Sequence, residues 1–177
     1  LKLTFHNTIR VQLFDWLELK NRSYLVREIE PEKIVHYAEQ PSAPYSRMGY
    51  DEAHRTLSNN ISVTFSVIWA VIQNAPDCHL IKLGTMGEYG TPNIDIEEGW
   101  IDVEHNGRRQ IFLYPRQAGS LYHTTKILDT DLLWFYVRSY GLRVTDLMQG
   151  PVYGLSTAEC DADHRLMPSF HYDDIFG

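Results

Sequence analysis

Residues 79–84 read HLIKLG, and this short apolar stretch decides the fold because a long helical pattern lies on each side of it. Its length and its apolar content predict a buried strand. Residues 51–74 before it predict a helix that ends ahead of Pro76, and residues 119–140 after it predict a helix that ends at Gly141. Strands that alternate with helices predict a parallel sheet with right-handed crossovers.

The pattern continues outward from this centre. Asn106-Gly107 is a strong signal for the turn of a β-hairpin. The other expected elements are strands at residues 9–14, 33–38 and 142–147, hairpin strands at 100–104 and 108–113, and a helix at 18–29. The chain therefore reads as a single α/β domain over residues 1–177, with a hairpin inserted near 100–113.

Composition excludes several functional classes. The 177 residues hold 16 Lys and Arg against 23 Asp and Glu, and the resulting charge of −7 argues against a strongly basic nucleic-acid binder. No apolar run approaches the ~20 residues that span a membrane. Two cysteines, Cys78 and Cys160, indicate a reducing compartment rather than a disulfide scaffold, and residues 1–10 lack the apolar core of a signal peptide. The chain starts at Leu1 and stops abruptly, so we expect a fragment.

Two other patterns do not indicate cofactor or metal sites. Gly84, Gly87 and Gly90 have the spacing of a dinucleotide fingerprint, but turn residues follow where a helix N-terminus is needed to hold a pyrophosphate. We interpret them as an irregular loop beside a ligand and expect any phosphate loop to lie before Leu1. The run Cys160-Asp161-Ala162-Asp163-His164 lacks a second Cys/His pair, so we expect no metal.

Tyr122 and Lys126 form a candidate catalytic pair, because residues four apart share a face of a helix. An ammonium group near a phenol lowers its pKa from about 10, so the tyrosine can act as a general base. Thr85, at the end of the central strand, can share a substrate hydroxyl with Tyr122. Spacing alone also fits a partly exposed tyrosine beside a solvated lysine.

Five stretches carry a specific resemblance. They are IVHYAEQPSAPYS (34–46), SNNISVT (58–64), HLIKLGTMGEYGTPNIDIEEG (79–99), YPRQAGSLYHTTK (114–126) and RVTDLMQGPVYG (143–154). With them the chain resembles the UDP-sulfoquinovose synthase family of extended short-chain dehydrogenases/reductases, over nearly its whole length. The resemblance implies a Rossmann-like sheet with helices on both faces and NAD as cofactor. It also implies that the first β-α-β unit and the C-terminal substrate domain are absent.

The resemblance further implies a reaction. Tyr122 takes the proton of the glucose C4 hydroxyl while NAD takes the hydride, Lys126 holds the nicotinamide ribose, and Thr85 hydrogen-bonds the reacting oxygen. The 4-ketone acidifies C5–H, water leaves from C6, sulfite adds and hydride returns. Glu88 is expected to move protons at C5 or C6.

Ligand contacts and partners are implied in the same way. The expected cofactor contacts are Asp15, Ala38, Glu39, Gln40, Asn60, Tyr122, Lys126, Gln149 and Val152. The expected substrate contacts are Thr85, Met86, Gly87, Glu88, His123, Gln149 and Tyr153. UDP-glucose and sulfite are the expected substrates, with a homodimer formed through the two long helices. The expected location is the cytoplasm, or the chloroplast stroma in a photosynthetic eukaryote.

Two departures from the family keep alternatives open. Val63 stands where the family has Gly, and Met148 stands where it has Asn. One alternative is another nucleotide-sugar epimerase or 4,6-dehydratase. The other is an inactive, truncated product, and we expect the isolated chain not to turn over UDP-glucose.

Overall fold

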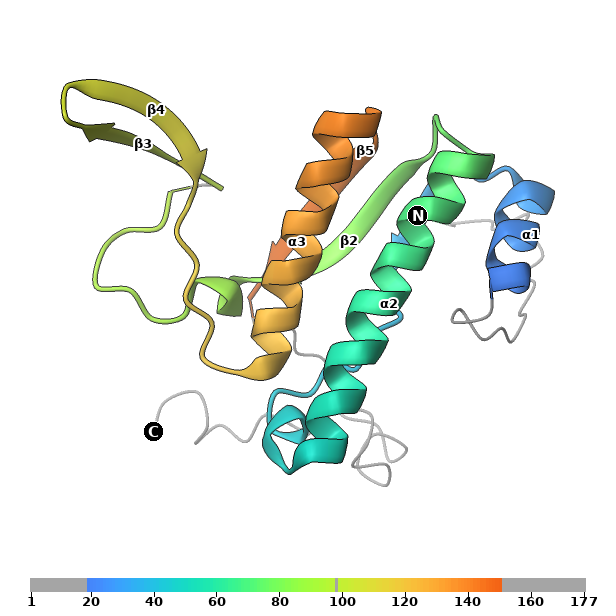
Figure 1. Ribbon diagram of the computed structural model, residues 1–177, viewed down its shortest axis with the longest axis horizontal. Coiled ribbons are helices and arrows are strands. Elements are labelled where there is room, and N and C mark those ends of the chain that lie inside the picture. The colour runs from blue at the N-terminus through green and yellow to red at the C-terminus, as the bar shows by residue number, and fades with distance from the viewer. Residues whose placement is uncertain (1–18, 98, 151–177) are drawn as a thin grey trace, which may run out of the picture.

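A parallel sheet of three strands, in the order β1-β2-β5, forms the centre of the chain (Figure 1). The computed structural model describes residues 19–97 and 99–150, so the strand expected at residues 9–14 lies outside it. The helices are α1 (Leu19–Ile29), α2 (Tyr50–Asn74) and α3 (Leu121–Tyr140), and two short 3-10 helices are η1 (Tyr45–Arg47) and η2 (Met86–Tyr89). The sheet strands are β1 (Lys33–His36), β2 (His79–Thr85) and β5 (Arg143–Gln149). The hairpin strands are β3 (Trp100–His105) and β4 (Arg108–Leu113).

The prediction of a parallel α/β sheet with an inserted hairpin is confirmed. α2 packs against both α1 and α3, and these helices form one layer beside the sheet (Figure 1). The observed strand and helix limits mostly lie within one or two residues of the predicted ones, but β1 ends at His36 instead of residue 38. The residues after His36 therefore already belong to the loop at the carboxyl edge of the sheet.

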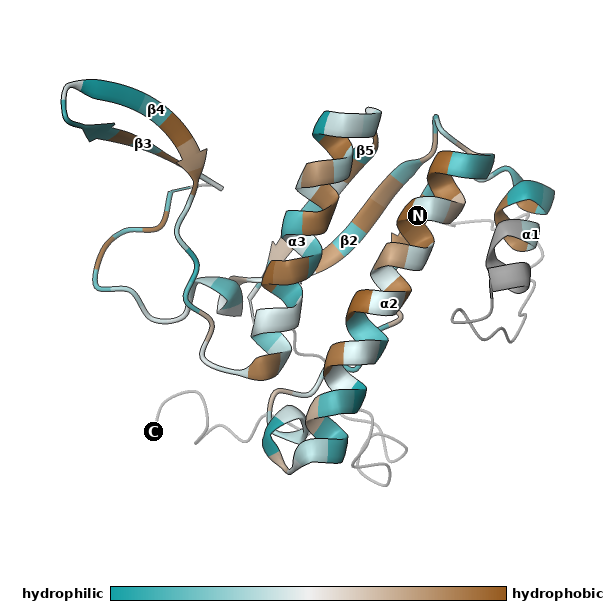
Figure 2. Ribbon diagram, viewed as in Figure 1, coloured by the Kyte–Doolittle hydropathy of each residue, from teal (hydrophilic) through white to brown (hydrophobic). Residues whose placement is uncertain are grey.

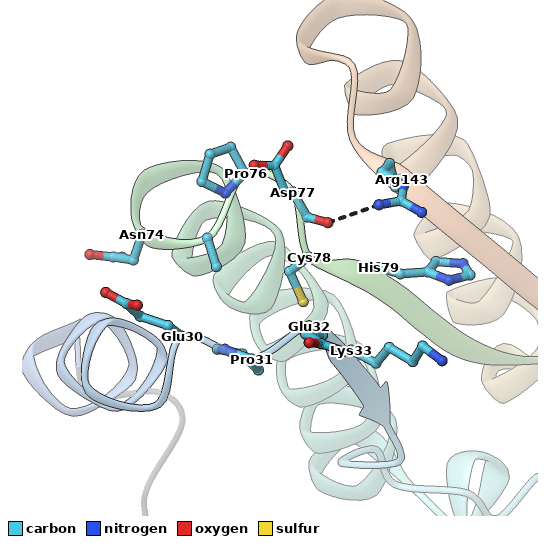
Figure 3. A pocket seen from close by; sticks show the side chains of 11 residues that line it. Glu30, Pro31, Glu32, Lys33, Asn74, Pro76, Asp77, Cys78, His79 and Arg143 are labelled. Carbon is cyan, nitrogen blue, oxygen red and sulfur yellow. Dashed lines mark hydrogen bonds between the residues drawn. The ribbon is translucent and has the colours of Figure 1, made fainter.

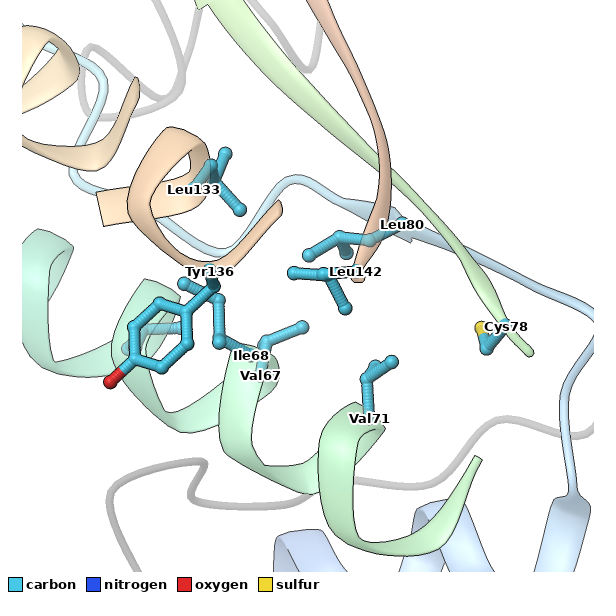
Figure 4. Packing of buried hydrophobic residues seen from close by; sticks show 9 residues of the cluster. Val67, Ile68, Val71, Cys78, Leu80, Leu133, Tyr136 and Leu142 are labelled. Carbon is cyan, nitrogen blue, oxygen red and sulfur yellow. The ribbon is translucent and has the colours of Figure 1, made fainter. Parts of the chain in front are cut away.

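The hydrophobic core lies between the helical layer and the sheet (Figure 4). Figure 2 shows the matching pattern, with apolar residues along α2, α3 and β2. Val63, which departs from the family pattern, is 4% exposed and belongs to this core, so the packing accommodates its side chain. The buried members are Val63, Val67, Ile68 and Val71 of α2, Cys78 and Leu80 at the start of β2, Leu133 and Tyr136 of α3, and Leu142.

The hairpin turns where the sequence predicts. Asn106 and Gly107 have φ values of 52° and 73°, the left-handed conformations that favour Asn-Gly in a two-residue turn. Trp100 of β3 packs edge-on against Trp134 of α3, with 4.8 Å between ring centroids. This contact holds the hairpin against the second long helix.

In the part of the chain that the structure describes, every helix is too short or too polar to cross a bilayer.

Candidate active site

The strand ends bring the predicted site residues to one edge of the sheet. Thr85 ends β2, and in the parallel register it pairs with Gln149, which ends β5. Glu39 follows β1, the neighbour of β2 on the other side. Carboxyl ends of parallel strands are where ligands bind in sheets of this kind.

The start of α3 is held at the same edge by two serines. Ser120 caps the helix, with its Oγ accepting a hydrogen bond from the backbone N–H of His123 at 3.2 Å. Ser46, which is 2% exposed, accepts from the backbone N–H of Tyr122 at 3.2 Å and donates to the carbonyl of Ala43 at 2.8 Å. The loop after β1 therefore fixes the first turn of α3. Ser46 ends the stretch 34–46 that carries the resemblance, but the sequence indicated no role for its side chain.

Lys126 joins α3 to β2 and to the loop that follows β1. Its Nζ donates to the carbonyl of Leu83 in β2 at 2.6 Å and lies 2.5 Å from Oε2 of Glu39. The same nitrogen is 5.6 Å from the centre of the Tyr122 ring. Tyr122 and Lys126 thus share a helix face, as their spacing predicts, and Lys126 bonds the strand that Thr85 ends.

The pKa of Tyr122 is raised to about 12, opposite to the expected direction. Burial of the phenol is the main cause, and the nearby Glu39 carboxylate adds to it. Lys126, whose ammonium was expected to lower this pKa, is ion-paired with Glu39. In this arrangement the phenol stays protonated at neutral pH.

Thr85, Gly87 and His123 connect the strand end to α3. Thr85 Oγ1 accepts from the backbone N–H of Gly87 at 3.1 Å, so its own hydrogen remains free to donate. The ring of His123 covers Gly87, where an added Cβ would lie 2.5 Å from Nε2, and it lies 5.1 Å from the Tyr122 ring. Burial, followed by the charge of Arg47, lowers the pKa of His123.

Glu88 and Asn60 are not part of this group. Glu88 is fully buried and its carboxylate is taken up by two cations, with Oε2 3.2 Å from Nη1 of Arg116 and Oε1 3.7 Å from Nζ of Lys82. Asn60 is also fully buried, and its amide bonds the main chain of Gln40 and the hydroxyl of Thr125. We therefore interpret both as buried residues that support the structure around the site.

Some of the other expected cofactor and substrate contacts lie among the described residues, and some lie outside them. Ala38 is exposed, Gln40 is half-buried and Met86 is 50% exposed, all close to the carboxyl edge. Met148 is the register partner of Gly84, next to the site. The expected contacts Asp15, Val152 and Tyr153 and the run at 160–164 lie outside the described residues, and within them no cluster could hold a metal ion.

Sequence reasoning missed three buried ionisable groups beneath the site. Lys82 and Asp129 have no exposed surface, and His36 is 4% exposed with Nε2 3.1 Å from the hydroxyl of Thr64. Burial lowers the pKa of His36 to about 4, whereas burial and the nearby Glu39 raise the pKa of Asp129 well above its ordinary range. Spacing offered one signal, because Asp129 follows Tyr122 by seven residues and so shares its helix face.

A pocket of about 480 Å³ lies at the opposite edge of the sheet (Figure 3). The end of α2 and the starts of β1, β2 and β5 line it, including Cys78 and His79. Arg143 donates a hydrogen bond across it to the carbonyl of Asp77 at 3.1 Å. None of the predicted catalytic residues lines this pocket, so the candidate site is at the carboxyl edge.

The chain is similar in sequence to known proteins. Residues 3–172 match the family described as "NAD dependent epimerase/dehydratase family". The chain is 44% identical over 170 residues to the chloroplastic UDP-sulfoquinovose synthase of Spinacia oleracea, covering 96% of this chain and 35% of that protein. It is 47% identical over 154 residues to the UDP-sulfoquinovose synthase of Sulfolobus acidocaldarius, covering 86% of this chain and 39% of that protein.

A solved structure shares the fold. The UDP-glucose 4-epimerase of Brucella ovis, crystallised with NAD, superposes with a TM-score of 0.60 at 20% identity, covering 76% of this chain and 36% of that one. The chain thus spans between a third and two fifths of the length of the synthases that it matches.

Proposed function

The chain belongs to the NAD dependent epimerase/dehydratase family, and from this premise we propose that it carries the catalytic face of a UDP-sulfoquinovose synthase. The reaction would join UDP-glucose and sulfite into UDP-sulfoquinovose. Identity of 44–47% with two synthases supports this choice within the family. The observation that carries the proposal is that Lys126 bonds the strand that Thr85 ends, with the Tyr122 ring 5.6 Å from its ammonium.

NAD fits the carboxyl edge of β1 and β2. Oε1 of Glu39 is buried without a hydrogen-bond partner among the described residues, while Oε2 pairs with the Lys126 ammonium. A carboxylate oxygen and an ammonium group together suit the hydroxyls of a ribose. Glu39 and Lys126 would hold the ribose, with Ala38 and Gln40 beside it. When bound, NAD supplies hydride acceptance from C4 and hydride return.

Three side chains would handle the C4 hydroxyl. As a phenolate, which the positive charge of Lys126 would stabilise, Tyr122 removes the proton of this hydroxyl, and Thr85 donates a hydrogen bond to the reacting oxygen. Burial first, and then the Glu39 carboxylate, raise the pKa of the phenol, so Glu39 must release Lys126 to let its charge act on Tyr122. The resulting 4-ketone acidifies C5–H, so water can leave from C6 and sulfite can add there.

Uncharged groups flank the expected sulfite path. Met86 is half exposed at the start of η2, and His123 has a lowered pKa that favours its neutral form. An uncharged approach avoids carboxylate repulsion of the sulfite anion. Glu88, turned inward, leaves this approach free of its charge.

We propose a homodimer formed through the outer faces of α2 and α3. Exposed aromatic groups gather there, with Phe65 44%, Phe135 48% and Tyr140 51% exposed. Their rings extend a pair formed by the half-buried Trp69 and the buried Tyr136, whose ring centroids are 5.8 Å apart. An exposed aromatic face on two packed helices is typical of a subunit interface. We assign the enzyme to the cytoplasm, or to the stroma in a photosynthetic eukaryote.

A hybrid enzyme tests the proposed reaction. This chain replaces the matching segment of the spinach synthase, and the hybrid receives UDP-glucose, NAD and sulfite. We expect UDP-sulfoquinovose by mass spectrometry with sulfite, and none without it. A 4-epimer or a 4-keto-6-deoxy sugar formed without sulfite would instead assign the chain to another branch of the family. No product from a folded hybrid would reject an active role for the chain. The isolated chain, assayed alongside, is expected to give no product.

A further inference from the structure

Lys82 is a fully buried cation in the middle of β2. Burial alternates along this strand, and Lys82 shares the inward face with Leu80 and Gly84. An unpaired charge at such a position would be strongly destabilising. The partners that compensate Lys82 therefore indicate what the side chain does.

The ammonium of Lys82 contacts groups from three other elements. It donates to the carbonyl of Lys126 and to the hydroxyl of Thr130, both in α3 and both at 3.1 Å. It also lies 3.7 Å from Oε1 of Glu88 in η2 and 3.5 Å from Oδ2 of Asp146 in β5. One buried group thus joins α3, β5 and the turn after Thr85.

The bonds between β2 and α3 are reciprocal. Lys82 donates to the carbonyl of Lys126, while Lys126 donates to the carbonyl of Leu83, the neighbour of Lys82. We call these two bonds the lysine clasp. Two bonds in opposite directions restrict both sliding and rotation of α3 against β2. Tyr122 lies one helical turn before Lys126, and Thr85 lies two residues after Leu83.

We propose that Lys82 is a positioning residue, which holds Lys126 and Tyr122 in place against the strand that carries Thr85. The roles of Tyr122 and Lys126 in this inference rest on the proposed function. The charge of Lys82 also opposes the rise in the pKa of Tyr122 that burial and Glu39 cause. The titratable groups facing Lys82 are Glu88 from η2, Asp146 from β5 and Lys126 from α3. Arg116 lies next to Glu88. The charge of Lys82 also acts on the more distant His36 and Asp129.

The full chain, labelled with ¹⁵N-lysine, gives a test that does not depend on activity. Lys82→Met removes the donor to the carbonyl of Lys126, and the ammonium protons of Lys126 should then exchange with solvent about ten-fold faster. Leu80→Ala is the matched control, because it removes a buried side chain from the same face of β2 and leaves the clasp intact. It should lower the free energy of unfolding but leave this exchange close to wild type. Unchanged exchange in a folded Lys82→Met chain would overturn the proposal.

A second variant covers the case in which Lys82→Met does not fold. Lys82→Met with Asp146→Asn removes one charge of each sign and keeps the pair between Glu88 and Arg116. We expect the same faster exchange at Lys126. Wild-type exchange in this double variant would show that charge balance, and not the clasp, holds Lys126, and would also overturn the proposal.

The hybrid enzyme separates this inference from the proposed function. There Lys82→Met should lower kcat by ~10²-fold with little change in KM, because displaced catalytic groups slow the chemical step more than binding. Lys82→Arg, which keeps the charge and the donors, should recover part of the loss. If the unmutated hybrid makes no product while Lys126 still responds in the isolated chain, the proposed function fails and the clasp stands. If the hybrid is active and Lys82→Met leaves its kcat unchanged, the positioning role of Lys82 is wrong while the proposed function stands.

Discussion

At the scale of single residues, Glu39 controls the charge that Tyr122 experiences. Its carboxylate pairs with Lys126 and is second only to burial in raising the pKa of the phenol. The two groups that we expect to hold the cofactor therefore hold each other in this structure. A tyrosine in this setting is a poor base until the pair between Glu39 and Lys126 separates.

Glu39→Gln should lower the pKa of Tyr122 from about 12 by roughly one unit, because it removes a nearby anion and frees the Lys126 charge. NMR titration of the full chain, labelled with ¹³Cζ-tyrosine, measures the shift, and the resonance is assigned by its loss in Tyr122→Phe. Asp131→Asn, which removes an exposed carboxylate from the same helix, is the control. A pKa that stays near 12 in Glu39→Gln would contradict the role given to Glu39.

Tyr122→Phe should reduce turnover of the hybrid enzyme by ~10²–10⁴-fold, the usual contribution of a general base. NAD affinity, measured by titration, should change little, because the aromatic ring is kept. Lys126→Ala should weaken both turnover and NAD binding, and the two substitutions should combine less than additively because they act on one proton transfer. Tyr24→Phe, at an exposed position of α1, should match wild type. Near-normal turnover in Tyr122→Phe would remove it as the base.

Some of these residues can be predicted from the sequence and others cannot. Tyr122, Lys126 and Thr85 follow from spacing on a helix and from a place at a strand end. The inward turn of Glu88 does not follow, because its partners Lys82 and Arg116 come from segments whose contacts only the fold determines. The sequence shows a lysine in an apolar strand, but not the oxygen atoms that accept its hydrogen bonds.

At the scale of elements, η2 and α3 are held together by the contact between Gly87 and His123. His123 is fixed from its own helix by Ser120, whose Oγ lies 3.0 Å from Nδ1. The ring therefore has little freedom to move away from the turn. This contact sets the spacing between the substrate-facing turn and the helix that carries Tyr122.

Gly87→Ala should destabilise the chain by about 1–3 kcal/mol, since the new methyl group would lie 2.5 Å from Nε2 of His123. Urea unfolding gives the free energy. Gly119→Ala is the control, because an added Cβ there meets no atom within 4 Å. His123→Ala removes the obstructing ring, so adding Gly87→Ala to it should cost much less. An equal cost in both backgrounds would show that the clash lies elsewhere.

The elements themselves were largely predictable, for physical reasons that differ among them. α2 ends at Asn74 because Pro76 follows, and the hairpin turns at Asn106-Gly107 because both residues tolerate a positive φ. The end of β1 was placed two residues too far, because the apolar run continues into Tyr37 and Ala38 while the strand pairing stops at His36. The composition of a segment does not show where its pairing with the neighbouring strand ends.

At the scale of the whole molecule, the buried acid Asp129 couples stability to pH. Its pKa in the folded chain is raised above the unfolded value of about 4, chiefly by burial. The folded state therefore keeps a proton that the unfolded state releases. Stability from this group is complete below about pH 4 and is lost as the pH rises toward and beyond neutrality.

Asp129→Asn removes this dependence while keeping the shape of the side chain. The variant should gain stability relative to wild type as the pH rises from 4 to 8, by on the order of 2 kcal/mol across that range. Urea unfolding at several pH values measures the difference, with Asp131→Asn as the control for loss of one carboxylate from α3. A difference that is constant with pH, or that shrinks as the pH rises, would contradict the assignment.

The hairpin β3–β4 has a consequence for the behaviour of the protein in concentrated solution. Among the described residues its two strands pair only with each other, so each leaves one row of backbone groups open to strands of other molecules. Toward the turn the ribbon carries charge, including the pair of Arg109 and Asp102 at 2.8 Å, whereas Ile111 and Phe112 near its base are exposed and apolar. These charges discourage edge-to-edge stacking of hairpins. The outer half of the hairpin therefore opposes aggregation through the exposed apolar residues near its base.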